Sequence, residues 1–196
     1  IYTLSLHDAL PILEWTLYFK NNGNADTPIL ENIRSLDTVW TRESAEFLLH
    51  HAVGSPCSIE DYRPLESTLT PKTIKHIGAM GGRPTNTDMS YFNLDMSGKG
   101  IIVAIGWPGQ WDSKWIRDDK DGLRVVAGQE LTHFTLHPGE EIRTPLTVLQ
   151  FWQGGDWIRA QNIWRRWMIA HNMPKPNGKV PPSQFVASSS RQFAEM

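Results

Sequence analysis

The sequence contains a single cysteine, Cys57, which excludes an internal disulfide framework. It also lacks any apolar run of the roughly 18 residues that a membrane-spanning helix needs. The net charge is only -2, so neither sign dominates enough to indicate nucleic acid or an acidic membrane surface as a partner. With 40% hydrophobic and 20% charged residues, the 196-residue chain has the composition of a globular domain rather than of a disordered segment.

Motifs of the common catalytic and metal sites are missing as well. There is no G-x-S-x-G, no P-loop and no G-x-G-x-x-G. His133 and His137 would suit zinc on a helix, but the alternating pattern around them predicts a strand. His50 and His51 are strand neighbours and should face opposite sides. The acidic segment 117–122 has arginine and glycine where a calcium loop needs ligands, so we expect a hairpin turn there. We therefore expect no metal and no cofactor.

What the sequence does contain is a series of short β-type runs separated by turn residues. No βαβ alternation occurs, so a parallel sheet is not expected. Strands at this spacing predict a mainly β chain folded as an antiparallel β-sandwich over residues 13–155. We expect an irregular connection over 54–71 and a glycine-rich loop over 78–87. The predicted strands cover 13–20, 39–40, 47–53, 91–94, 100–107, 123–127, 130–136 and 146–152.

One helix is expected after the sandwich, over residues 156–173. Asp156 can cap it, and Pro174 disfavours helical geometry in the residue before it. Apolar residues recur along it at steps of three and four, which is the spacing of one helix face. We expect this face to dock partly on the sandwich and partly on another domain, through Trp157, Trp164, Trp167 and Met168.

The two ends of the sequence differ from its middle. Residues 1–12, IYTLSLHDALPI, resemble a translated sequencing-adapter read-through, so we expect them to form a leader without evolved function. Residues 174–196 are rich in proline and serine and are typical of a linker toward a further domain. Nothing in the sequence assigns a cellular compartment.

Nine tryptophans are an unusual number and allow two interpretations. In the segment GWPGQW, Trp107 and Trp111 flank a Pro-Gly turn that carries Gln110. Exposed indoles can stack on a sugar ring while the amide bonds its hydroxyl groups; alternatively, the two rings pack across a hairpin. The segment GGRPTN offers Arg83 and Asn86 for hydroxyl or carboxylate groups, or is a surface loop without a ligand.

Two longer segments resemble a known family. YFNLDMSGKGIIVAIGWPGQW and GQELTHFTLHPGEEIRTPLTVLQFWQGGDWIRAQNIWRRWMIAHNMP are similar to the N-terminal region of α-galactosidases (melibiases) of the glycoside hydrolase family 36 type. The resemblance covers residues 13–196 and is most specific over 91–174. It implies a large, supersandwich-like β-sandwich, a connecting helix and a (β/α)8 barrel, with retaining hydrolysis of terminal α-galactosides and no metal.

The resemblance places both catalytic aspartates in the barrel, which needs about 200 further residues. No catalytic residue is therefore carried over, and we expect an accessory domain that is inactive alone, with the barrel as its partner. In the family, sandwich loops can reach a barrel mouth, sometimes that of a neighbouring subunit, so a homo-oligomer is allowed. The alternative is a free-standing carbohydrate-binding or structural sandwich. The candidate substrate-binding residues are Asp61, Arg63, Arg83, Asn86, Trp107, Gln110 and Trp111.

Overall fold

The computed structural model describes residues 12–182, and most of its strands form two antiparallel sheets that pack face to face. The six-stranded sheet has the order β1-β14-β9-β8-β5-β6, and the four-stranded sheet has the order β4-β11-β10-β7. The predicted mainly β sandwich is thus confirmed. The strands of the first sheet are β1 (Ile12–Trp15), β5 (Phe47–Ala52), β6 (Pro64–Leu69), β8 (Tyr91–Asp95), β9 (Lys99–Gly106) and β14 (Leu146–Gln153). Those of the second are β4 (Leu36–Thr41), β7 (Ile74–Gly78), β10 (Trp111–Arg117) and β11 (Gly122–Gln129).

The core lies between the two sheets because alternate residues of each strand point inward. Phe92 of β8 meets Trp111 and Trp115 of β10 edge-on, with ring centroids 5.8 and 5.3 Å apart. All three rings are fully buried. Aromatic pairs in this geometry add to the stabilisation from burial alone, so Trp111 and Trp115 serve the core.

Several predicted boundaries were wrong. β6 lies within the stretch expected to be irregular; it starts with Pro64, which an edge strand tolerates because no partner needs its missing N–H. β10 was not predicted, because polar residues interrupt its apolar pattern. The predicted strand 130–136 shrinks to β12 (His133–Phe134), and the predicted strand 13–20 splits into β1 and β2 (Tyr18–Lys20). β1 includes Ile12 of the expected leader; residues 1–11 lie outside the described part of the chain.

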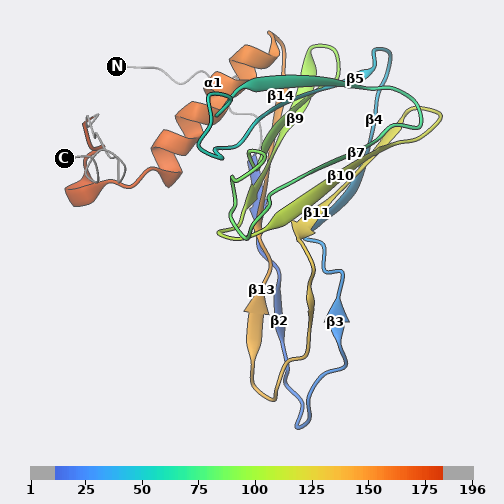
Figure 1. Ribbon diagram of the computed structural model, residues 1–196. Coiled ribbons are helices and arrows are strands. Elements are labelled where there is room, and N and C mark those ends of the chain that lie inside the picture. The colour runs from blue at the N-terminus through green and yellow to red at the C-terminus, as the bar shows by residue number, and fades with distance from the viewer. Residues whose placement is uncertain (1–11, 183–196) are drawn as a thin grey trace.

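Two short ribbons extend from one end of the sandwich (Figure 1). β2 pairs with β13 (Glu141–Arg143), and β3 (Leu30–Glu31) pairs with β12. Strand β2 follows β1 after only two residues, while β13 precedes β14, so the ribbon continues the β1–β14 pair outward. This departure from the sheet explains why one predicted strand became two.

The predicted helix is confirmed as α1 (Trp157–Trp167), which continues as a π-helical turn over Met168–Asn172. Asp156 caps it, since its carboxylate accepts a 2.8 Å hydrogen bond from the Arg159 N–H. A short 3-10 turn, Pro176–Gly178, follows. The helix packs on the outer face of the six-stranded sheet, where Ala160 is buried with Ile102 and Trp152. No helix within residues 12–182 has the length and apolarity to span a membrane.

Candidate functional site

The strand order brings four connections to the same end of the sandwich. In an antiparallel sheet, the end of one strand lies beside the start of its neighbour. Ala52, at the end of β5, therefore lies near the start of β8, and the end of β9 adjoins the same point because Tyr91 pairs with Ala104. The four connections form what we call the loop cluster, which consists of residues 53–63, 79–90, 107–110 and 130–132.

Backbone hydrogen bonds fasten the first two loops of the cluster to each other. The Ser55 N–H donates to the Thr85 carbonyl at 2.6 Å, and the Gly54 N–H donates to the Thr87 carbonyl at 2.8 Å. A side chain at position 54 would collide with the chain it contacts, because its Cβ would lie 2.1 Å from the Thr85 oxygen. Gly54 therefore allows a backbone approach that any other residue would prevent.

Gln110 ties the other two loops into the cluster. Its Oε1 accepts a 2.9 Å hydrogen bond from the Gly82 N–H, and its Nε2 donates to the Glu130 carboxylate. The neighbouring Trp111 donates from Nε1 to the Pro84 carbonyl at 2.7 Å. The amide of Gln110 thus holds loops together, and its two polar atoms are already engaged by protein groups.

The two tryptophans of GWPGQW have different positions. Trp111 is fully buried, so it cannot stack on a sugar, and its assignment to substrate binding is corrected to a core role. Trp107 is half-buried against the core, and the Arg143 guanidinium lies 5.3 Å from its ring centroid. This geometry is a cation–π contact, which the sequence did not reveal because Arg143 lies 36 residues further along the chain.

Asp61 and Arg63 belong to the first loop of the cluster. The Asp61 carboxylate accepts hydrogen bonds from the Ser58 N–H at 2.9 Å and the Ser55 hydroxyl at 2.8 Å. The Ser58 N–H is the largest of the influences that hold the pKa of Asp61 below its usual value. Arg63 is exposed and pairs with Glu60. Both residues therefore have local structural partners.

Arg83 and Asn86 lie on the second loop, beside Gln110. Arg83 is exposed, and its backbone N–H donates a hydrogen bond to the Met80 carbonyl at 3.4 Å. Asn86 is half-buried, and its side-chain amide lies over Gly81 of the same loop.

The sequence analysis overlooked one titratable group in the cluster. Asp88, between β7 and β8, has its pKa raised mainly by burial, although the Gly78 N–H acts in the opposite direction. Its position in a polar loop gave no signal of burial. No three His, Cys, Asp or Glu side chains in the described part of the chain are grouped to hold a metal ion.

The tryptophan face of α1 forms the second region that the sequence singled out. Trp157 stacks on His50, with ring centroids 4.2 Å apart, and Trp164 lies 5.4 Å from the Tyr91 ring. Asn93 completes the contact: its amide donates to the Trp157 carbonyl at 3.1 Å and accepts from Trp152 Nε1 at 2.9 Å. The first part of the face is therefore covered by the sheet of this chain.

The second part of the same face is less covered. Trp167 contacts Trp164 at a centroid distance of 5.0 Å and His171 at 6.0 Å, which are both residues of the same helical segment. Met168 is 38% exposed. The contact of part of this face with the sandwich agrees with the expectation, while its docking on another domain stays a prediction.

Comparison with known proteins gives a result only at the level of structure. No protein-family profile matches the chain, and no curated protein matches its sequence. Solved structures that share its fold include α-galactosidases. One, from Lactobacillus brevis, has a TM-score of 0.65 and 13% identity over 81% of this chain and 21% of that one.

Two further structures give the same picture. The galactosidase domain of the α-galactosidase–sucrose kinase AgaSK has a TM-score of 0.60 and 16% identity, over 73% of this chain and 20% of that one. The GH36 α-galactosidase AgaA from Geobacillus stearothermophilus, solved alone and in complex with raffinose, has a TM-score of 0.57 and 16% identity, over 74% and 20%. The chain thus has the fold of a part of GH36 α-galactosidases and spans about a fifth of their length.

Proposed function

We propose that this chain is the accessory β-sandwich domain of a retaining α-galactosidase of the GH36 type, and that it supports a catalytic barrel. The observation that carries the proposal is the uneven coverage: the fold accounts for about three quarters or more of this chain but only a fifth of each enzyme. We infer that a domain that forms so small a part of a hydrolase supports the larger part, which carries the catalytic residues. The substrates are then terminal α-galactosides, such as the stachyose and raffinose bound in neighbours' structures.

We further propose that the loop cluster borders the substrate pocket of the complete enzyme. Arg83 and Asn86 supply hydrogen-bond donors for sugar hydroxyl groups, and Trp107 supplies the partly exposed edge of an indole. Gln110 acts indirectly, because its amide fixes the loop that carries Arg83. Asp61 and Arg63 shape the adjoining loop rather than the chemistry.

The chain alone is expected to be inactive toward an α-galactoside. Retaining hydrolysis needs a nucleophile and an acid on either side of the glycosidic bond. Two carboxylates of the loop cluster instead hold loops: Asp61 accepts from Ser55 and Ser58, and Glu130 accepts from Gln110. Neither is free to attack an anomeric carbon.

The direct test is to sequence the adjoining reading frame and assay its product. We expect a barrel domain downstream, with raffinose and aryl α-galactoside hydrolysis by the full-length protein and none by this chain. Arg83→Ala should then lower kcat/KM of the full-length enzyme by roughly tenfold, the effect of one lost charged hydrogen bond. Turnover by this chain alone that disappears on mutation of one of its own carboxylates would refute the proposal.

The alternative class, a free-standing carbohydrate-binding module, makes a different prediction. Such a module binds oligosaccharides through a complete surface of its own, so titration of this chain with raffinose would give a calorimetric signal that Trp107→Ala removes. Under the accessory-domain proposal the same titration is silent, because the rest of the pocket lies on the barrel.

A further inference from the structure

The side of α1 that faces away from the sheet has an unusual composition. We call it the outer helix face, and it consists of Ile158, Asn162, Arg165, Arg166 and Ile169. These positions follow one another at helical spacing, opposite the Trp157–Trp164 side that contacts the sheet. Ile158 is 51% exposed and Ile169 is 43% exposed.

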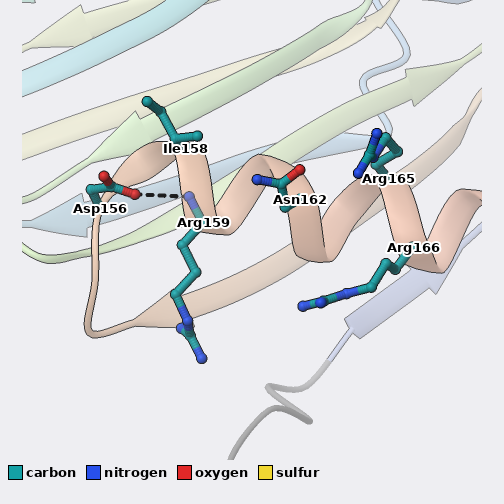
Figure 2. A pocket seen from close by; sticks show the side chains of 6 residues that line it. All are labelled: Asp156, Ile158, Arg159, Asn162, Arg165 and Arg166. Carbon is teal, nitrogen blue, oxygen red and sulfur yellow. Dashed lines mark hydrogen bonds between the residues drawn. The ribbon is translucent and has the colours of Figure 1, made fainter. Parts of the chain in front are cut away.

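A shallow groove of about 630 Å³ runs along this face. Figure 2 shows Asn162 midway along it, with the Arg166 side chain extending to the same side of the helix as that of Arg159. Arg159 reaches back to the Gln153 and Gly154 carbonyls at 3.5 and 3.3 Å. A second groove of about 440 Å³ shares Ile158, Asn162 and Arg165 and continues the surface toward Tyr91.

The charges on the outer helix face have one sign, and Asp156 lines only the end of the groove where the helix begins. Between Trp157 and Met173 the sequence contains three arginines and no aspartate or glutamate. Within residues 12–182, Arg165 and Arg166 form no ion pair. A helix face that only contacts water usually mixes both signs, often as Glu and Lys four residues apart. Exposed isoleucine together with arginine and methionine, and no lysine or glutamate, is instead the composition of a protein interface.

We propose that the outer helix face docks onto an acidic surface of the catalytic barrel carried by the same polypeptide, an inference that rests on the proposed function. Charge complementarity identifies the partner surface, because two unpaired arginines need carboxylates when they leave water. Ile158 and Ile169 supply the apolar contacts on either side of Asn162. The tryptophan side of the helix holds it on the sandwich, so that α1 forms a layer between two domains.

A lipid surface is the other partner that a basic amphipathic helix can have. Such a helix inserts its apolar side, but here Trp157 and Trp164 are already engaged by His50 and Tyr91 of the sheet. Only isolated apolar side chains remain on the outer helix face. The observations therefore favour a protein surface.

The test uses hydroxyl-radical footprinting of the full-length enzyme and of this chain. Met168 and Met173, each 38% exposed at the C-terminal end of the same helical segment, serve as oxidation reporters. We expect both to oxidise at least roughly fivefold more slowly in the full-length enzyme, since an interface core excludes solvent. The double variant Arg165→Glu, Arg166→Glu should restore the rate found in this chain and lower galactoside hydrolysis. The matched control reverses two exposed lysines elsewhere, Lys20→Glu and Lys114→Glu, and should leave the protection in place.

A milder variant separates docking from folding of the helix. Arg165→Gln, Arg166→Gln removes the charges without introducing repulsion, and its circular dichroism should match that of the wild type while protection of Met168 falls partway. About 0.5 M salt should have the same partial effect on the wild type, because it screens exposed charge pairs.

The possible failures are distinguishable. A full-length protein without α-galactosidase activity would overturn the proposed function. An active full-length enzyme whose Met168 and Met173 oxidise as fast as in this chain would overturn only the docking proposal. Sedimentation of this chain with phosphatidylserine vesicles, lost in the Arg165→Glu, Arg166→Glu variant, would overturn it in favour of a lipid partner.

Discussion

The two ends of the sandwich are built in opposite ways. At one end, tight turns between neighbouring strands surround a buried arginine: Arg117 has a fully buried side chain and donates to the Asp118 carboxylate and the Lys120 carbonyl, each at 2.6 Å. At the other end, the loop cluster joins long connections through bonds between distant residues, such as Ser55 to Thr85. The first end closes on itself, while the second presents Arg83 to the surroundings.

This difference indicates where stability and function reside. At the Arg117 end, the buried guanidinium has hydrogen-bond partners for its charge and also contacts Glu46 and the Phe47 ring. A fully satisfied network of this kind is rigid and has few polar groups left to bind a ligand. The loop cluster depends on a few long-range bonds and on one glycine. Functional residues are often carried on such loops, held by a rigid scaffold.

The largest effect is expected at the closed end. Arg117→Met should lower the free energy of unfolding by about 3–5 kcal/mol, because it leaves a carboxylate and several carbonyls without their buried donor. Urea unfolding monitored by tryptophan fluorescence measures this. Arg124→Met, which removes an exposed pair with Asp37, should cause a much smaller loss. Equal losses in the two variants would show that the closed end is not specially stabilised.

The next effect tests the loop cluster. Gly54→Ala should cost about 2–3 kcal/mol, since the new Cβ would force the Thr85 backbone away. Amide hydrogen exchange should rise in both 53–63 and 79–90 and stay unchanged around Arg117. Gly139→Ala is the control, because nothing lies within 4 Å of its Cβ position, although its φ of +84° still carries a modest cost. Unchanged exchange in 79–90 would contradict the coupling of the two loops.

A third effect concerns pH and the inward-facing side of β5. Burial, reinforced by Lys75 and His50, lowers the pKa of His51 to about 4. The unfolded chain therefore binds a proton below about pH 6.5 that the folded chain does not accept, so stability falls as pH drops from 6.5 toward 4 and changes no further below it. We expect a loss of about 1–2 kcal/mol, reduced from the full shift by partial solvent access. His51→Gln should flatten this part of a stability–pH curve, and an unchanged slope would exclude His51 as its source.

The smallest effect sharpens the description of the loop cluster as a hydrogen-bonded assembly. Gln110→Ala should lower the free energy of unfolding by about 1 kcal/mol, the usual net value of the bonds it removes. Exchange at the Gly82 amide should increase, because its acceptor is gone. Gln153→Ala, an exposed amide at the opposite end, should have no measurable effect on either quantity.

Much of the fold followed from local pattern. Three kinds of sequence signal predicted their elements reliably, because each depends on nearby residues only. They are the apolar run of β9, the alternation in β5 and β11, and the Asp156 cap with the helical spacing that follows it. Strand β6 was missed because it begins with a proline, which an edge strand tolerates. Strand β10 was missed because it contains serine and arginine, which a core-facing strand can bury when hydrogen-bond partners are present. Those partners, such as the Ile77 carbonyl for Ser113, come from other strands.

The sequence by itself determined the class of fold, the helix with its cap and three of the four segments that form the loop cluster, because composition, periodicity and turn residues act locally. Only the tertiary structure decided that Trp111 belongs to the core while Trp107 lies half-buried under Arg143. It also decided that Gln110 bridges two loops and that the tryptophans of α1 meet His50 and Tyr91. The physical reason is that burial and hydrogen-bond partnership depend on which distant strands become neighbours, and local pattern does not specify that.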